Sequence, residues 1–335
     1  MKICIARLDK MGDMILTLPI IKSLKNEYPQ SKIHILASET NAKVIKNTEY
    51  IDKLIIIKDN PAILFEELIN IRKNNYDYFI NFSPNFKGLI LCCFSKSFKK
   101  ATLIFKSRYK NKKISKILTI LLCKIFCNYL FIVDRFNRIK NNQELHQTLM
   151  MFRLIEICKL KFSRDTLIDI RLPKEKYVFT KKKSIVIHLS AKWINSFYSE
   201  DNFIELIKLI IKKEYVILLT TDNSTKSVFK KIFNKFPLIY QFDENDLINI
   251  QSNVIIMDKL DYSSWNKAIY SSQKVITPEC GCSHIAAANK IPASIIYDPN
   301  NFAEAIHKEY APWKSEYKKF TFDQKNLNLE LIRDL

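Results

Sequence analysis

The sequence predicts an α/β protein built from two doubly wound parallel-sheet domains. Short apolar runs rich in β-branched residues alternate with longer amphipathic segments along the whole chain. Runs this uniformly apolar are typical of parallel strands that helices cover on both faces. A long stretch without such runs separates two sets of β-α units, and 335 residues are enough for two domains with their own cores.

The strand pattern recurs in both halves of the chain. In the first half the expected strands are 2–6, 32–36, 53–57, 78–82 and 102–105. In the second half they are 184–189, 215–220, 253–257, 274–277 and 293–297. The intervening segments, such as 199–211, show helical spacing, which gives the alternation that parallel sheets require.

The domain boundary is expected near residues 165–180. Hydrophobic periodicity fades there, and Pro173 and a lysine cluster appear. We therefore predict an N-terminal domain over 1–170 and a C-terminal domain over 171–322. The last segment, 323–335, looks helical and is expected to pack back on the first domain.

Cysteine usage favours a reduced, cytoplasmic protein. The eight cysteines mostly lie in apolar runs such as "ILCCF" and do not form a paired C-x-x-C framework with zinc spacing. The opening "MKICIARL" is typical of a strand and not of a signal peptide.

The net charge of +20 has two explanations. One is an anionic partner: nucleic acid, a membrane surface or a phosphorylated substrate. The other is compositional bias, because Lys, Ile and Asn are abundant throughout the chain.

A basic segment at 96–116 precedes an apolar run at 117–133. This order suits a peripheral membrane anchor, in which lysines meet lipid phosphates and apolar groups enter the interface. Lys124 and Asn128 interrupt the run, which argues against a spanning helix. The alternative is a core helix and a strand behind a solvated basic loop.

Glycine is rare, so its positions are informative. Of Gly12, Gly88 and Gly281, the first and last each lie between an expected strand and an expected helix. Ligands bind at the carboxyl ends of parallel strands, and helix N-termini bind phosphate. Two such turns, one per domain, predict an active cleft between Gly12-Asp13 and the run 279–284; the alternative is two ordinary tight turns.

Several enzyme classes lose support from absent motifs. The chain has no G-x-G-x-x-G, Walker A or G-x-S-x-G pattern, and its five histidines show no H-x-x-x-H spacing. Dinucleotide-dependent redox, NTPase, hydrolase and zinc chemistry are therefore disfavoured.

Several segments of the sequence resemble a known family. The segments "CIARLDKMGDMILTLPIIKSLKNEYPQSKIHILAS", "YIDKLIIIK" and "YDYFINFSPNFKG" look like the start of glycosyltransferase family nine, the ADP-heptose:lipopolysaccharide heptosyltransferases. The run "ECGCSHIAA" matches the family's D-[ST]-G-x-x-H-x-A-A signature, and "ELHQTLMMFRLIEICKLK" resembles its interdomain helix. The similarity covers nearly the whole chain in order.

The resemblance implies a GT-B fold, two Rossmann-like domains facing a cleft, and inverting transfer without a metal or other cofactor. Asp13 occupies the catalytic-base position, in an acceptor-side loop with Arg7, Lys10 and Gly12. An inverting transfer needs one carboxylate to take the proton of the acceptor hydroxyl. The structural alternative is an aspartate that caps the first helix.

By the same resemblance the second domain binds the sugar nucleotide. Backbone N–H groups around Cys280, Gly281 and Cys282 would receive the diphosphate, helped by the dipole of the following helix. His284 matches the family histidine and would touch the phosphate or hold the loop; a purely structural role is equally open.

Two departures from the family pattern put the donor sugar in question. Glu279 stands where the family has Asp, and Ser196 stands in place of the phosphate-binding lysine. Lys192 could supply the missing charge, and Ser190 could donate a hydrogen bond. Asp222, just past a strand end, is a weaker candidate for a ribose contact.

We therefore expect a glycosyltransferase that moves heptose from ADP-heptose to the inner core of lipopolysaccharide or lipooligosaccharide. Its acceptor would be an anionic lipid bearing Kdo or heptose, and the enzyme would sit peripherally on the cytoplasmic face of the inner membrane, with no nucleic-acid partner. The alternatives are transfer of a different nucleotide sugar, an inactive nucleotide-sugar-binding relative and a basic nucleic-acid-binding protein.

Overall fold

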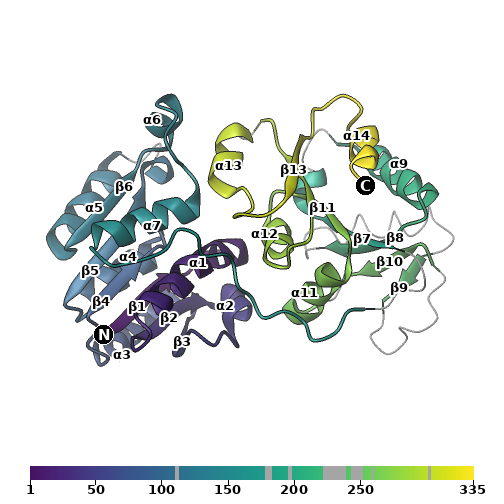
Figure 1. Ribbon diagram of the computed structural model, residues 1–335. Helices are drawn as coiled ribbons and strands as arrows, with labels where there is room; N and C mark the ends of the chain where they lie inside the picture. Colours follow the sequence, from purple (N-terminus) through teal and green to yellow (C-terminus); the bar gives the residue numbers. More distant parts are fainter. Residues whose placement is uncertain are drawn as a thin grey trace. The chain divides into compact units, whose positions relative to one another are not determined.

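The computed structural model describes residues 1–109, 113–177, 183–194, 198–221, 239–242, 252–258, 260–300 and 303–335 (Figure 1). The chain forms two compact units. Unit 1 comprises Met1–Arg171 with Lys308–Ala311, and unit 2 comprises Leu172–His307 with Pro312–Leu335.

Unit 1 is a six-stranded parallel sheet in the order β3-β2-β1-β4-β5-β6. Its strands are β1 (Lys2–Arg7), β2 (Lys32–Ser38), β3 (Lys53–Ile57), β4 (Tyr78–Asn81), β5 (Lys99–Phe105) and β6 (Tyr129–Val133). Ile3, Cys4 and Ile5 of the central strand β1 are fully buried, as expected for a strand covered on both faces.

Helices cover this sheet in two groups. The helices of unit 1 are α1 (Met11–Glu27), α2 (Glu39–Ile45), α3 (Leu64–Arg72), α4 (Phe86–Phe94), α5 (Lys113–Phe126), α6 (Arg135–Lys140) and α7 (Gln147–Ile157), with 3-10 turns η1 (Pro61–Ile63) and η2 (Lys106–Tyr109). α1 packs against α2 and α7, whereas α4 packs against α3 and α5 (Figure 1).

Unit 2 contains a seven-stranded parallel sheet in the order β13-β12-β11-β7-β8-β10-β9. Its strands are β7 (Ser184–Leu189), β8 (Val216–Thr221), β9 (Ile239–Gln241), β10 (Val254–Met257), β11 (Lys274–Pro278), β12 (Ala293–Tyr297) and β13 (Tyr317–Thr321). Its helices are α8 (Ala191–Ile194), α9 (Glu200–Lys212), α11 (Tyr262–Ser271), α12 (Gly281–Ala288), α13 (Ala303–Tyr310), whose last three residues belong to unit 1, and α14 (Leu327–Arg333).

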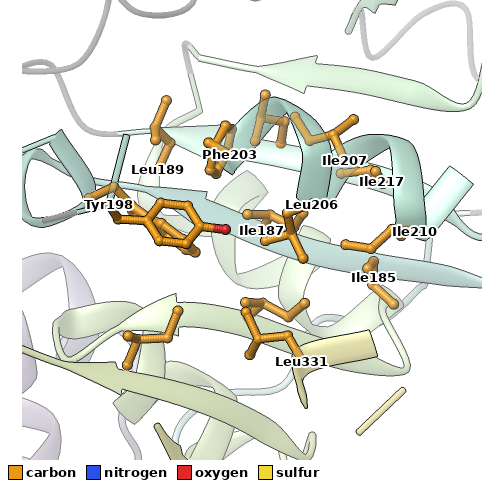
Figure 2. Close-up of a cluster of buried hydrophobic side chains, with 14 of the residues drawn as sticks. Ile185, Ile187, Leu189, Tyr198, Phe203, Leu206, Ile207, Ile210, Ile217 and Leu331 are labelled. Carbon is orange, nitrogen blue, oxygen red and sulfur yellow. The ribbon is translucent and has the colours of Figure 1, made fainter. Parts of the chain in front are cut away.

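Helix α9 shows how the sequence specifies these elements. Ser199 caps it by accepting a hydrogen bond from the backbone N–H of Asn202, and acidic residues occupy its first turn. Phe203, Leu206 and Ile210 repeat at helical spacing and lie on the β7 side of the helix in the unit 2 core (Figure 2).

The predicted fold class is confirmed, and each expected strand coincides with an observed one. Three strands were not expected as separate runs: β6, β9 and β13. All three are edge strands. In β13 only Phe320 is buried, so the strand lacks the apolar run that marks its neighbours. β6 is hidden in the sequence because it continues the apolar run of α5.

The expectation that 323–335 packs on the first domain is wrong. α14 packs against α9, and Leu327 and Leu331 are buried in the unit 2 core (Figure 2). The carboxylate of Asp334 lies 2.6 Å from Nζ of both Lys274 and Lys318. Leu327 and Leu331 are four residues apart, so both fall on the face that meets α9.

We predict that Leu331→Ala lowers the free energy of unfolding of unit 2 by about 2–5 kcal/mol, because it leaves a cavity in the core. Urea unfolding followed by tryptophan fluorescence reports on this unit, since Trp193, Trp265 and Trp313 all belong to it. Leu329, which is 48% exposed in the same helix, is the matched control, and Leu329→Ala should cost less than about 0.5 kcal/mol. Equal effects of the two substitutions would contradict the placement of α14.

Candidate active site

The candidate site of unit 1 is the turn between β1 and α1. Lys10 is the N-cap of α1, and Asp13 lies in the first turn. Oδ2 of Asp13 accepts a hydrogen bond of 3.2 Å from the backbone N–H of Lys10. Asp13 is therefore not the N-cap itself; it reaches back to the N-cap from the third helical position, where a carboxylate also faces the positive end of the helix dipole.

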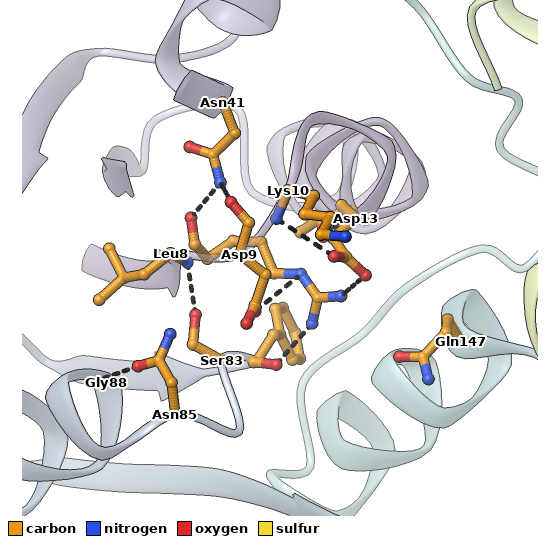
Figure 3. A network of polar contacts seen from close by, with 12 residues as sticks. Leu8, Asp9, Lys10, Asp13, Asn41, Ser83, Asn85, Gly88 and Gln147 are labelled. Carbon is orange, nitrogen blue, oxygen red and sulfur yellow. Dashed lines mark hydrogen bonds and ion pairs between the residues drawn. The ribbon is translucent and has the colours of Figure 1, made fainter. Parts of the chain in front are cut away.

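Arg7 fixes the other oxygen of Asp13 (Figure 3). Its Nη2 donates to Oδ1 of Asp13 at 2.6 Å, its Nη1 donates to the carbonyl of Phe82 at 2.5 Å, and its Nε lies 3.6 Å from Oδ2 of Asp9. The guanidinium is only 2% exposed, whereas the Asp13 side chain is 17% exposed. Burial opposes the charge of Arg7, but Asp13 and Asp9 outweigh it and raise the pKa of the guanidinium above its ordinary value.

Asn41 in α2, just after β2, and Ser83, just after β4, hold the loop in place. Nδ2 of Asn41 donates to the carbonyls of Arg7 and Asp9 at 2.9 and 3.0 Å. The Ser83 hydroxyl accepts from the N–H of Leu8 at 2.5 Å (Figure 3). Neither Asn41 nor Ser83 was predicted from the sequence. The signal that could have found them is their position just after two strands that flank β1.

The three glycines differ in what the structure requires of them. None of the three has a positive φ, so a left-handed backbone explains neither Gly12 nor Gly281. The steric requirement lies at Gly88 in α4. A Cβ there would come within 2.6 Å of Oδ1 of Asn81 and 2.8 Å of Cβ of Ser83. Gly88 therefore lets α4 approach the segment that supports the Arg7 loop.

A cavity of about 470 Å³ opens beside this loop within unit 1. Its lining includes Leu8, Asp9, Ser38, Thr40, Asn85 and Lys87. Asp9 follows β1, Thr40 follows β2 and Asn85 follows β4, and Asp59, which also lines the cavity, follows β3. The cavity therefore lies at the carboxyl edge of the sheet, where ligands bind in open α/β sheets.

Unit 2 has a candidate site of its own, at the turn between β11 and α12. Cys280 is the N-cap of α12, which begins at Gly281. The first N–H groups of a helix have no acceptor within it and face outward with the positive end of the dipole. Burial raises the pKa of the thiols of Cys280 and Cys282, so both are neutral and neither adds a negative charge at the helix N-terminus.

His284 is buried in α12, with 2% of its surface exposed. Ser283 beside it is fully buried, and its hydroxyl donates to the carbonyl of Cys280 at 2.7 Å. Of the two roles predicted for His284, contact with the phosphate and support of the loop, this burial favours support of the loop.

Lys192 meets Glu279 at the edge of this turn. Its Nζ lies 2.6 Å from Oε2 of Glu279 and also donates to the backbone carbonyl of that residue. The buried Ser190 hydroxyl accepts from the N–H of Lys192 at 3.4 Å. β7 and β11 are neighbours in the sheet, so the residues that follow them come together. Ser196 and Asp222 lie outside the described residues.

The thiols of Cys93, Cys123 and Cys127 lie within 4.8 Å of one another between α4 and α5, and no other group of potential metal ligands occurs in the part of the chain that the structure describes. Cys93 lies in α4, Cys123 lies in α5 and Cys127 directly follows α5, so spacing in the sequence does not reveal this group. It lies at the ends of α4 and α5, near the amino edge of the sheet, and therefore away from Asp13. All eight cysteines are free thiols.

Comparisons with known proteins identify the family. A family model described as Glycosyltransferase family 9 (heptosyltransferase) matches residues 68–328. Lipopolysaccharide heptosyltransferase 1 of Campylobacter coli is 27% identical over 312 residues, which cover 89% of this chain and 84% of the relative.

Solved structures agree on the fold. Escherichia coli ADP-heptose lps heptosyltransferase II superposes with a TM-score of 0.73 at 12% identity, covering 100% of this chain and 97% of that one. Escherichia coli heptosyltransferase WaaC with ADP gives 0.68 at 16% identity, covering 96% and 93%. The architecture is therefore GT-B, with two Rossmann-like units.

These findings confirm the prediction of a glycosyltransferase and set aside the basic nucleic-acid-binding protein. The family match includes the Glu279–His284 turn and begins after Asp13. The two α/β units, the order of their strands and the extent of the family match together show that this chain belongs to glycosyltransferase family 9, the heptosyltransferases.

Proposed function

We propose that this protein transfers heptose from ADP-heptose to the inner core of lipopolysaccharide or lipooligosaccharide, with inversion and without a metal. The family membership and the similarity to a heptosyltransferase along 89% of the chain support this activity. The observation that carries the mechanism is the carboxylate of Asp13, partly exposed and fixed on both oxygens by Arg7 and the N–H of Lys10.

Asp13 is the proposed general base. Each carboxylate oxygen has two lone pairs, so one contact to Arg7 and one to Lys10 leave a free lone pair on each oxygen. In the transfer, the acceptor hydroxyl gives its proton to Asp13 while its oxygen attacks the anomeric carbon. The bond to the leaving diphosphate breaks, and the electron pair stays on the diphosphate. Arg7 is a positioning residue that sets the direction of the carboxylate.

The donor diphosphate is proposed to bind at the N-terminus of α12. Backbone N–H groups of Gly281 and Cys282 would bind its oxygens, and Lys192 would supply the cation that stabilises the leaving group. Glu279 supports this role because its ion pair holds Nζ of Lys192 beside the same turn. Ser190 would complete the loop as a hydrogen-bond donor.

A second candidate is transfer of a different nucleotide sugar. Glu279 is one methylene longer than the family aspartate, and in this structure its carboxylate is engaged by Lys192. Incubating the enzyme with ADP-heptose or with other nucleotide sugars, and a deacylated core acceptor, distinguishes the two by the mass added to the acceptor. Donor hydrolysis or binding without transfer to any acceptor would favour the inactive relative.

We predict that Asp13→Asn lowers kcat for heptosyl transfer by about 10²–10⁴-fold, because the amide keeps the shape but cannot take the proton. Mass spectrometry of the acceptor measures the rate, and calorimetry with ADP should show unchanged binding. Asp52, which pairs with Lys25 away from the loop, is the matched control, and Asp52→Asn should retain activity. Full activity of Asp13→Asn would remove Asp13 as the base.

We further predict that Lys192→Ala weakens ADP binding by about 10–100-fold, the loss expected for one charge-assisted hydrogen bond to phosphate. The dependence of ADP affinity on salt concentration should also become shallower. Lys212 is exposed at the end of α9 in the same unit, and Lys212→Ala tests for a general effect of net charge. If both substitutions had the same small effect, Lys192 would not be the phosphate-binding cation.

A further inference from the structure

Helix α5 carries an apolar stripe on its outer side. Ile114, Ile117, Leu118, Leu121 and Ile125 are between 50% and 74% exposed. Their spacing of three and four residues puts them on one face of the helix, about 100° wide. A contiguous exposed apolar surface of this kind marks an interaction site, in contrast to single exposed residues.

The opposite side of α5 is already packed. Cys123 is fully buried in a cluster with Leu89 and Ile104, and Ile120 and Leu122 pack against the same cluster. α5 contacts α4 and β6 through this side. The exposed stripe is therefore a second apolar face, which the core of unit 1 does not need.

Basic residues accompany the stripe. α5 contains three lysines and no acidic residue, and Lys124 is exposed beside Leu121 and Ile125. α6, which contacts η2 as α5 does, exposes Phe136 (49%) among basic residues. Apolar groups flanked by cations match the interface of an anionic bilayer. A second copy of this chain fits less well, because two faces with only positive charges would repel each other.

The position of α5 relates the stripe to the proposed acceptor site. α5 connects β5 to β6, so its first turn lies at the carboxyl edge of the sheet, the same edge as the Asp13 loop. Among the described residues no helix has the length and apolarity to cross a membrane. A helix of 14 residues with one apolar face suits binding in the plane of the interface.

We propose that α5 is a membrane-docking helix: its stripe enters the headgroup region of an anionic bilayer while its lysines contact lipid phosphates. The relevance of this docking to catalysis rests on the proposed function, because only a lipid-linked acceptor requires it. The binding itself is independent of any transfer activity and can be measured alone.

The test is sedimentation of the full chain with phosphatidylglycerol/phosphatidylethanolamine vesicles and with phosphatidylcholine vesicles. We expect binding to the anionic vesicles that falls at least about tenfold in Ile117→Ser/Leu118→Ser. The matched control is Phe65→Ser/Ile69→Ser, which removes exposed apolar residues of α3 (73% and 41%) in the same unit and should change binding less than about twofold. Lys116→Gln/Lys124→Gln should weaken binding to anionic vesicles by about fivefold per lysine.

Three outcomes would overturn the proposal. These are no binding to vesicles, equal losses in the α5 and α3 variants, or a dimer of the unmodified chain in sedimentation velocity that only the α5 variant abolishes. The proposed function fails separately. Transfer to a soluble deacylated acceptor should be unchanged in the α5 variant, whereas absence of transfer in every protein would reject the heptosyltransferase and leave the vesicle result standing. Circular dichroism checks that the variants are folded.

Discussion

The acceptor-side loop depends on one buried cation, the guanidinium of Arg7. It ends the central strand β1 and binds the carbonyl of Phe82, which follows the neighbouring strand β4, as well as Asp13 in α1. A buried charge is tolerated only when opposite charges and hydrogen bonds compensate it, and here Asp13, Asp9 and a carbonyl do so. The planar guanidinium also fixes the direction of each bond. The carboxylate of Asp13 is thus oriented by the pairing of β1 with β4, which is part of the rigid sheet.

The topology explains where the candidate site of each unit lies. In unit 1 the chain proceeds from β1 to β2 and β3 on one side, and from β4 to β5 and β6 on the other. In unit 2 it proceeds from β7 to β8 on one side, and from β11 to β12 and β13 on the other. The strand order therefore reverses between β1 and β4 and between β7 and β11, the places where open α/β sheets bind ligands. Arg7 and Ser83 flank the first switch point, and Lys192 and Glu279 flank the second.

Hydrophobic periodicity and the family motifs predicted the central strands and the candidate residues that lie in those motifs. Central strands such as β1 and β7 are apolar on both faces and were found, whereas the edge strand β13, with Phe320 alone buried, was not. Asp13 and Glu279 were found through their motifs. Arg7 donates to the Phe82 carbonyl, and Asn41 donates to the Arg7 carbonyl. Each of these hydrogen bonds joins segments more than 30 residues apart, which no local sequence pattern links. The packing of the C-terminal helix was predicted wrongly. Periodicity shows that a helix has an apolar face, but it does not show which surface that face packs against.

A comparison of helices α5 and α9 shows that the composition of the chain does not explain the exposed apolar stripe of α5. Both helices pack an apolar side on a sheet of the same lysine-rich chain. α9 exposes Glu205, Lys208 and Lys212, the polar outer face that a surface helix of a globular protein has. α5 exposes isoleucines and leucines there, although polar residues at these positions would preserve its packing. Compositional bias acts on both helices alike and so cannot account for the difference. The outer face of α5 is therefore explained by a binding partner and not by the packing of unit 1. The interface of an anionic bilayer would bind the apolar stripe through its acyl region and the lysines through its phosphates.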